Sequence, residues 1–345
     1  MNQNAGCKDA EWLKGAHVII RICTFTKQGE DKTREVFDNW QEMIPQYREG
    51  SVSLGQWTGE CFQKHLPILF VGACGIAVRA VAPYVKDKLN DSAVLVMDEK
   101  GEFVIPILSG HVGGANELAQ MISKRAGATP VITTATDVEG MFSADVFAVK
   151  NGLRIVNREG IREISGKLLR GEEVSITWED EISASGKELP SGLKFVPFDM
   201  PHADIRIVTK ETAGTCSLLL EAKEFILGIG CKKGKTFEEL QSLLDVDWEK
   251  ISAIASIDLK AKEEGLWELA QFHHLPFMTF SAKKLEEVEG DYTKSEFERE
   301  ITGTDNVCER AALCLAGPGG ELVKRKTAEN GMTFAVAKRK IRLSF

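Results

Sequence analysis

Short apolar runs alternate with segments of helical periodicity in two stretches of this chain, and this alternation constrains the fold more than any other feature. The run at residues 67–72 (PILFVG) is wholly apolar and bounded by turn residues, which is typical of a strand buried on both faces. The first stretch predicts these elements in order: strand 16–22, helix 30–47, strand 67–72, helix 75–85, strands 92–97 and 103–108, helix 115–125 and strand 129–134. Strands that alternate with helices favour a largely parallel sheet.

The alternation weakens after residue 134 and returns at residue 225. The weak stretch predicts a helix at 158–169 and short strands at 173–177, 194–197 and 203–208. The last stretch predicts strand 225–230, helix 237–244, strand 252–257, helix 263–273, strand 276–280, helices 282–288 and 307–316, and strands 321–325 and 332–337. We therefore predict a mixed α/β fold in three domains: N-terminal α/β (1–140), a small α+β middle domain (141–221) and C-terminal α/β (222–345), the outer two with largely parallel sheets.

The composition argues against several classes of protein. A net charge of −8 does not suit a general nucleic-acid-binding surface. No apolar run approaches the roughly 20 residues that span a bilayer, and residues 1–14 lack the apolar centre of a secretion signal. The 8 cysteines form no Cys-x-x-Cys pair, so neither a zinc site nor a disulfide framework is indicated. We expect a cytoplasmic protein without a metal site, and with neither nucleic acid nor a membrane as partner.

A glycine-rich turn at residues 108–117 (LSGHVGGANE) joins a predicted strand to a predicted helix. Glycines allow a ligand to approach the backbone, and the N–H groups of a first helical turn attract anions. A tight connector, in which an acidic side chain stabilises the helix dipole, is the alternative. The candidate residues in this turn are His111, Gly113, Gly114, Asn116 and Glu117.

Hydroxyl and carboxylate side chains follow the next predicted strand, at residues 131–137 (VITTATD). The carboxyl ends of strands in open parallel sheets are where ligands bind. Threonine and aspartate are also good helix caps, so a capped turn is an equal alternative. The candidates here are Thr133, Thr134 and Asp137.

A third glycine-rich turn, at residues 228–236 (GIGCKKGKT), carries several lysines. A Walker phosphate loop needs four residues between its glycines, whereas Gly230 and Gly234 are separated by three, and Lys233 stands where a dinucleotide fingerprint needs its third glycine. The turn still suits carboxylates or phosphates, although solvated lysines are the alternative. We select Gly230, Cys231, Lys232 and Lys233 from it, and Lys260 after the next predicted strand, where Asp258 and Glu263 also allow a surface ion pair.

Particular strings go further than these patterns. GACGIAVRAVAP (72–83), LSGHVGGANELA and TPVITTATDV resemble the N-terminal domain of the CbiG-type cobalt-precorrin-5A hydrolases. LGIGCKKG, IASIDLKAKEEGLWELA, the stretch at 295–297 and VCERAAL resemble the C-terminal domain of that family, which also occurs alone in CobE-type proteins. The resemblance covers about residues 71–337. Lys232 and Lys233 stand where arginines are expected, which loses forked carboxylate recognition, and Glu298 stands where an apolar residue is expected.

The resemblance implies a hydrolase that opens the δ-lactone of cobalt-precorrin-5A and releases acetaldehyde, giving cobalt-precorrin-5B, in anaerobic cobalamin biosynthesis. The cobalt-corrinoid substrate carries its own metal, so no cofactor is expected on the protein, and its carboxylate arms explain local cations in an acidic chain. His111, or else Glu117 or Asp137, is then the general base, and N–H groups at residues 113–115 form an oxyanion hole. The implied substrate contacts are Arg79, Gly113, Gly114, Asn116, Thr133, Thr134, Gly230, Cys231, Lys232, Lys233 and Lys260.

Two other functions are consistent with parts of the sequence. Half of the chain matches a domain that occurs alone, so a non-catalytic protein that binds and hands over corrinoid intermediates is the first alternative. A nucleotide-dependent enzyme that uses GCKKGKT is the second, and the glycine spacing counts against it. Neighbouring pathway enzymes and a second copy of the chain are the protein partners to expect.

Overall fold

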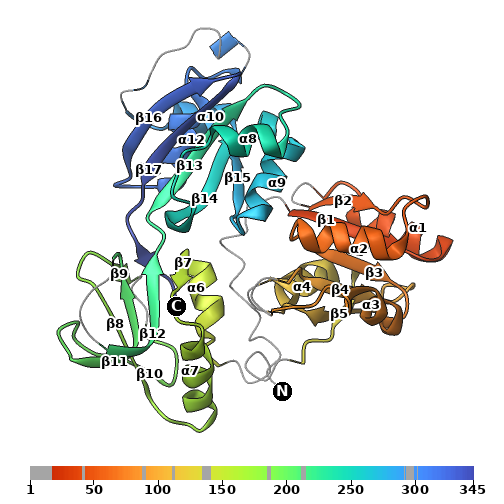
Figure 1. Cartoon of the computed structure of the whole chain (residues 1–345), viewed down its shortest axis with the longest axis horizontal. Helices are drawn as coiled ribbons and strands as arrows, with labels where there is room; N and C mark the ends of the chain where they lie inside the picture. Colours follow the sequence, from red (N-terminus) through yellow and green to blue (C-terminus); the bar gives the residue numbers. More distant parts are fainter. Residues whose placement is uncertain are drawn as a thin grey trace. The chain divides into compact units, whose positions relative to one another are not determined.

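The structure, a computed structural model, divides into two compact units, residues Met1–Val138 and Glu139–Phe345, and each is described here by itself (Figure 1). It describes residues 18–40, 43–87, 91–110, 113–133, 141–184, 188–210, 215–290, 292, 299–300 and 302–345. The predicted mixed α/β fold with largely parallel sheets is confirmed. No helix within the described ranges is both long enough and apolar enough to cross a bilayer.

The first unit is built on a sheet with the strand order β2-β1-β3-β4-β5-β6. Its strands are β1 (Val18–Thr24), β2 (Met43–Tyr47), β3 (Ile68–Val71), β4 (Val94–Met97), β5 (Phe103–Leu108) and β6 (Thr129–Pro130). Strands β1 to β4 pair in parallel, β5 runs antiparallel to β4, and β6 is parallel to β5. All four residues of β3 are buried, as its apolar run predicts for a central strand.

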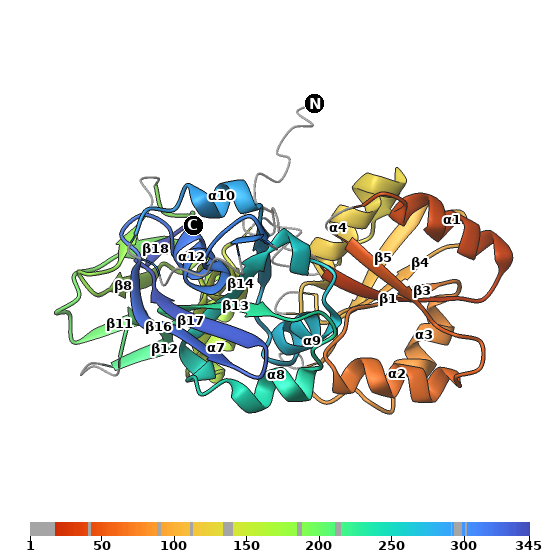
Figure 2. The ribbon, with the colours of Figure 1, turned by 90° about the horizontal axis from the view of Figure 1, so that it is seen from above.

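Helices cover both faces of this sheet. They are α1 (Lys27–Phe37), α2 (Leu54–Gln63), α3 (Cys74–Val81) and α4 (Ala115–Ala126). Contacts join α1 to α4 and α2 to α3, and Figure 2 shows these two pairs on opposite sides of the strands. The first unit is therefore doubly wound, with a core formed between the sheet and its helices.

The helix predicted at residues 30–47 is wrong in its second half. Helix α1 ends at Phe37, and β2 follows as an edge strand parallel to β1. Pro45 explains the difference, because proline lacks a backbone N–H and disrupts a helix interior but is tolerated on an edge strand. The sequence also did not indicate α2, in which Gly55 and Gly59 lower the helix propensity while Trp57 is almost fully buried.

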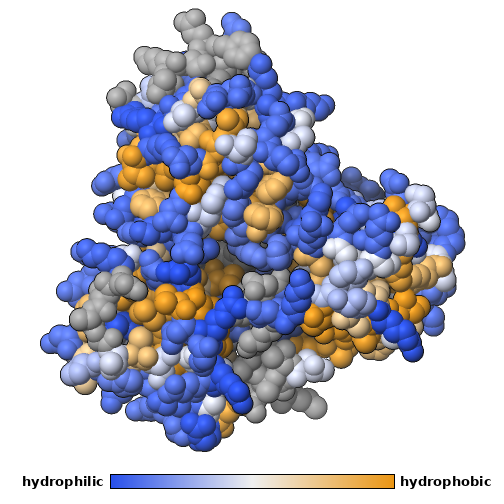
Figure 3. Space-filling view, viewed as in Figure 1, coloured by the Kyte–Doolittle hydropathy of each residue, from blue (hydrophilic) through white to orange (hydrophobic). Residues whose placement is uncertain are grey.

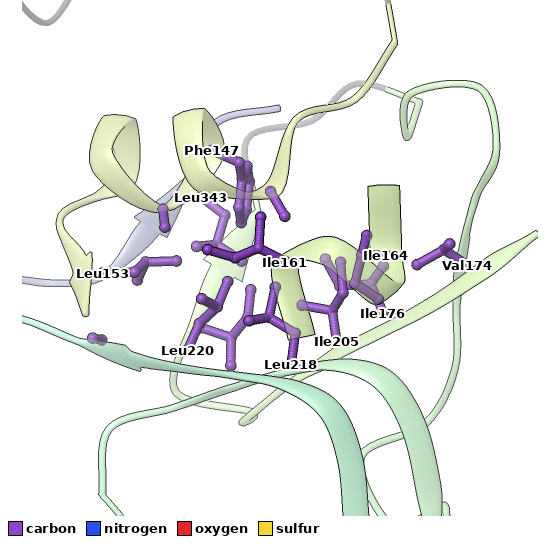
Figure 4. Packing of buried hydrophobic residues seen from close by; sticks show 14 of the residues in the cluster. Phe147, Leu153, Ile161, Ile164, Val174, Ile176, Ile205, Leu218, Leu220 and Leu343 are labelled. Carbon is purple, nitrogen blue, oxygen red and sulfur yellow. The ribbon is translucent and has the colours of Figure 1, made fainter. Parts of the chain in front are cut away.

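The second unit begins with a sheet that we call the middle sheet, and its strand order is β10-β8-β11-β12-β7. Its elements are α6 (Ala144–Asn151), β7 (Leu153–Ile155), α7 (Glu159–Leu169), β8 (Val174–Trp178), β10 (Leu193–Phe195), β11 (His202–Val208) and β12 (Thr215–Ala222). β8, β10, β11 and β12 run parallel, and β7 is antiparallel to β12. Apolar side chains of α6 and α7 pack on this sheet, together with Ile341 and Leu343 (Figure 4). The latter lies in β18 (Arg342–Leu343), which pairs with β9 (Ser183–Ala184).

A further sheet of the second unit, which we call the C-terminal sheet, has the order β15-β14-β13-β17-β16. Its strands are β13 (Phe225–Cys231), β14 (Ile251–Ile257), β15 (Phe277–Phe280), β16 (Glu321–Glu329) and β17 (Met332–Lys338). The helices are α8 (Phe237–Leu243), α9 (Glu264–Phe272), α10 (Ala282–Glu286) and α12 (Val307–Ala316), with 3-10 turns η1 (Trp248–Lys250) and η2 (Asp258–Lys260). β13, β14 and β15 are parallel, so their carboxyl ends share one edge.

Candidate functional site

The carboxyl ends of β3 and β5 lie at opposite edges of the first sheet. Val71, the last residue of β3, pairs with Met97 at the end of β4. Leu108, the last residue of β5, pairs with Val94 at the start of β4. A turn that follows β3 is therefore separated from the turn at residues 109–117 by the length of these strands.

The edge at the end of β3 is the topological switch point of the first sheet. The chain leaves β1 through α1 to β2 on one side, and it leaves β3 through α3 to β4 on the other. Ligands of open α/β sheets bind outside the carboxyl ends of strands at such a point. The loops after β1 and β3 are therefore a second candidate binding site, at the opposite edge from the turn at residues 109–117. The sequence motifs did not show that these two sites lie at different edges.

Arg79 lies at this switch-point edge. Its Nη1 donates a hydrogen bond of 3.0 Å to the carbonyl oxygen of Gly75, so the guanidinium bends back over the first turn of α3. Among the described residues Arg79 forms no ion pair with an acidic side chain. Figure 3 shows hydrophobic side chains at the surface around α3 and β5, where Val78 is 52% exposed. The structure does not bring Arg79 together with Gly113 and Asn116.

The turn at residues 109–117 uses part of its own backbone for internal hydrogen bonds. The N–H of Ala115 donates to the Ser109 carbonyl at 3.1 Å, and the N–H of Asn116 donates to the Gly110 carbonyl at 2.9 Å. The predicted oxyanion hole therefore cannot use the Ala115 amide in this conformation. The amides of Gly113 and Gly114 have no hydrogen-bond partner among the described residues.

Close packing holds this turn in shape. A Cβ on Gly113 would lie 2.4 Å from the Cβ of Ser109 and 2.8 Å from its carbonyl oxygen, so only glycine fits there. Gly114 caps α4 with φ +80°, in the left-handed region. Ser109 also has a positive φ of 54°, and its hydroxyl is buried without a hydrogen-bond partner among the described residues. Such strained backbone clusters at functional sites, and Ser109 was not among the candidates chosen from the glycine-rich turn.

The other predicted residues of the first unit divide into described and undescribed positions. Asn116 is buried and Glu117 is partly buried in the first turn of α4. Thr133 is exposed three residues after β6, and because β6 is parallel to β5 it lies toward the same edge as Leu108. His111, Thr134 and Asp137 lie outside the described residues, so their roles stay predictions.

In the second unit, the parallel register of β13 and β14 brings the remaining candidates to one edge. Gly228 pairs with Ala255, so Cys231 and Asp258 both follow at the carboxyl ends of their strands. Lys232 and Lys233 are exposed in the turn after β13, with no ion pair among the described residues. They are free to meet an anionic ligand.

Lys260 differs from these two lysines because its ammonium is already paired. It lies 2.9 Å from a carboxylate oxygen of Glu263, and the side chains are 15% and 9% exposed. The other oxygen of Glu263 accepts a hydrogen bond from the N–H of Gly234. The ion pair that the sequence left as an alternative is thus present, and it ties η2 to the turn after β13.

Lys235 is also engaged within the protein. Its Nζ lies 2.7 Å from Glu239, and Glu239 forms a capping box with Thr236 at the start of α8.

Burial raises the pKa of the Cys231 thiol to about 11. The Cys231 thiol is therefore protonated at neutral pH.

Both halves of the chain match families described from cobalamin synthesis. The family described as cobalamin synthesis G N-terminal matches residues 56–137. The family described as cobalamin synthesis G C-terminus matches residues 225–337. The first match includes the loop after β3 and the turn at residues 109–117, and the second begins at β13 and ends in β17.

Relatives extend this similarity over most of the chain. The cobalt-precorrin-5A hydrolase of Salmonella typhimurium is 35% identical over 295 residues, which are 80% of this chain and 83% of the relative. The cobalt-precorrin-5A hydrolase of Priestia megaterium is 30% identical over 347 residues, 94% of this chain and 92% of the relative. A crystal structure of CobE, a protein from the cobalamin biosynthetic pathway, shares 31% identity, covers 33% of this chain and 89% of its own, and has a TM-score of 0.32. The chain belongs to the CbiG family of cobalamin synthesis.

Proposed function

We propose that this chain is a cobalt-precorrin-5A hydrolase, which opens the δ-lactone of its cobalt-corrinoid substrate, releases acetaldehyde and leaves cobalt-precorrin-5B. The observation that carries the proposal is 35% identity to a relative of that name over 80% of this chain. Local chemistry supports it, because exposed Lys232 and Lys233 offer positive charge for carboxylate arms on a protein of net charge −8.

The reaction has two stages. Water adds to the lactone carbonyl, the ester C–O bond breaks, and the products are a carboxylate and a hydroxyl on the former meso carbon. That hydroxyl then loses its proton and becomes a carbonyl, the bond from this carbon to the ring breaks, and the ring carbon takes up a proton. The carbon leaves with its methyl group as acetaldehyde, so no oxidant or reductant is needed.

The turn at residues 109–117 is the proposed place of lactone opening. His111 removes the proton from water, with Glu117 and Asp137 as the alternative bases. The amides of Gly113 and Gly114 stabilise the oxyanion of the tetrahedral intermediate, since neither has a partner among the described residues. Asn116, Thr133 and Thr134 orient the lactone, while Arg79, at the other edge of the sheet, binds a carboxylate arm.

Incubation of the purified chain with cobalt-precorrin-5A tests the function directly. We expect acetaldehyde, measured with alcohol dehydrogenase and NADH, and a product mass that corresponds to the gain of water and the loss of acetaldehyde. Binding without acetaldehyde would instead support a corrinoid hand-over protein. Replacement of His111 by alanine tests the base, and unchanged turnover of that variant would assign the role to Glu117 or Asp137.

The remaining parts of the proposal concern cofactor, partners and location. Cobalt arrives within the substrate, so the chain needs no cofactor of its own for a hydrolysis. We place the enzyme in the cytoplasm with neighbouring enzymes of the pathway, whose soluble intermediates it shares, and expect it to associate as a homodimer. Light scattering on the purified chain measures the oligomeric state, and a monomer mass would contradict that expectation.

A further inference from the structure

An exposed leucine and two lysines without ion pairs among the described residues follow neighbouring strands of the second unit. Strands β13 and β14 are parallel neighbours in the register Gly228 to Ala255. Lys232 follows the end of β13 by one residue, and Leu259 follows the end of β14 by two. Because both strands end at the same edge, these side chains emerge from adjacent turns of the sheet.

Internal contacts fix the two turns to each other. Glu263 accepts a hydrogen bond from the Gly234 N–H in the lysine turn and pairs with the ammonium of Lys260, the residue after Leu259. Glu263 is itself 9% exposed, so this bridge is shielded from solvent. Lys232, Lys233 and Leu259 are therefore held on a common rigid support, and ligand binding there does not have to order a loose loop.

The three side chains have the chemistry of an amphiphilic surface. Leu259 is 64% exposed, the highest value among the exposed large hydrophobic residues of the described chain. Lys232 and Lys233 are exposed and carry no ion pair within the described ranges, whereas Lys260 and Lys235 are neutralised by Glu263 and Glu239. An apolar side chain and exposed cations in adjacent turns of one edge suit a ligand with an apolar face and an anionic rim.

We propose that Leu259, Lys232 and Lys233 form a corrinoid-binding edge on the C-terminal sheet, and that Glu263 is its positioning residue. The inference rests on the proposed function, because a tetrapyrrole macrocycle with acetate and propionate arms has the required apolar face and carboxylate rim. Leu259 contacts the face of the ring, and the two ammonium groups bind its carboxylates. Lys260 does not contact the substrate but holds Glu263 in place.

Two ligands separate the apolar contact from the charged contacts. The probes are a cobalt corrin polycarboxylate and its fully methylated ester, which keeps the ring and removes the charges. For the full-length chain we expect Lys232→Gln and Lys233→Gln each to raise Kd for the polycarboxylate about threefold and to leave Kd for the ester unchanged. Leu259→Asn should raise Kd for both ligands about fivefold. Loss of this pattern, with Leu259→Asn binding like wild type, would overturn the inference.

Matched controls come from elsewhere in the second unit. Leu169 is 53% exposed at the end of α7, and Lys194 is an exposed lysine of β10. Leu169→Asn and Lys194→Gln should bind both ligands like wild type, and equal losses in these controls would contradict a specific edge. Acetaldehyde release by the wild-type chain tests the proposed function separately. If the wild type is active and the edge variants bind both ligands normally, only the binding edge is contradicted.

Glu263→Gln tests positioning. The amide keeps the volume and an acceptor for the Gly234 N–H but removes the charge that holds Lys260. With cobalt-precorrin-5A as substrate we expect KM to rise about threefold with kcat unchanged, since the edge binds but does not react. A parallel loss of kcat, or no change in KM, would show that Glu263 does not position a binding edge.

Discussion

The turns after β5 and β13 both join a strand to a helix through glycines, yet the structure uses their glycines differently. After β5, Gly113 is packed against Ser109, and the amides of Ala115 and Asn116 are used within the turn. After β13, a Cβ on Gly234 would meet no atom within 4 Å, and the turn is instead held by a carboxylate from the next crossover. The first turn is shaped by steric fit, and the second by charge.

The turn after β5 is therefore suited to bind a ligand through backbone amides, and the turn after β13 through lysine side chains. A sterically fixed turn presents amides in a permanent geometry, as the stabilisation of a transition state requires. A turn held by the Glu263 carboxylate leaves Lys232 and Lys233 exposed, which suits the binding of carboxylates over a wider area. The two turns would then serve reaction and binding respectively.

Gly113→Ala should give the largest effect, because it opposes the steric fit of the first turn. The added Cβ meets both the Cβ and the carbonyl oxygen of Ser109. We expect the free energy of unfolding of the first unit to fall by about 3 kcal/mol, measured by urea denaturation. Gly114→Ala, which has a positive φ but open space around its Cβ, should cost only about 1 kcal/mol. Equal losses would remove the steric side of the comparison.

The alkylation rate of Cys231 tests whether the thiol at the start of the second turn is unreactive at neutral pH. Burial raises the pKa of this thiol from 9.0 to about 11, so the thiolate is scarce below that pH. At pH 8 we expect alkylation of Cys231 to be about 100-fold slower than in the urea-unfolded chain. The rate should keep rising with pH until about 11, followed by mass spectrometry of the peptide. A plateau near pH 9 would mean that burial does not shift the thiol.

Lys260→Met tests the ion pair that holds the second turn. The change leaves the Glu263 carboxylate buried without its cation, which should lower the free energy of unfolding by about 2 kcal/mol. The double variant Lys260→Met with Glu263→Met should recover most of this loss, because no unpaired charge remains. Full additivity of the two single losses would show that the pair does not couple them.

Lys235→Met should have the smallest effect on stability. Its partner Glu239 lies one helical turn away and is 48% exposed, so solvent screens the pair. We expect a loss below about 0.5 kcal/mol in the same urea measurement. A loss as large as that of Lys260→Met would mean that exposure does not rank these lysines.

The strands and most helices could be predicted because their signal is local. Apolar runs such as PILFVG and FILGIG marked β3 and β13, and the glycine turn before α4 marked its start. Pro45 signals that the helix ends before it, but the helical spacing of apolar residues continues past Phe37, so the predicted helix was too long. Helix α2 could not, since Gly55 and Gly59 weaken the local signal and tertiary burial of Trp57 compensates.

The candidate site was less predictable because it depends on register and partners. The resemblance implied that Arg79 and Gly113 contact the same substrate, and the antiparallel pairing of β4 with β5 separates the two positions in the sheet. The sequence left open whether Lys260 forms an ion pair, whereas the structure pairs it with Glu263 and leaves Lys232, in the turn after β13, exposed. The hydrogen bond from the Gly234 N–H to Glu263 joins two crossovers that are 29 residues apart, and no local pattern encodes such a contact.

The return of residues 341–345 to the middle sheet has a consequence for biosynthesis on the ribosome. Ile341 and Leu343 complete the hydrophobic core of residues 144–222, and the ring of Phe345 stacks on Phe147 at 4.8 Å. These residues are translated only after the entire C-terminal sheet. The middle sheet therefore lacks part of its core while more than a hundred later residues are translated, and apolar surface that is exposed at that stage favours aggregation.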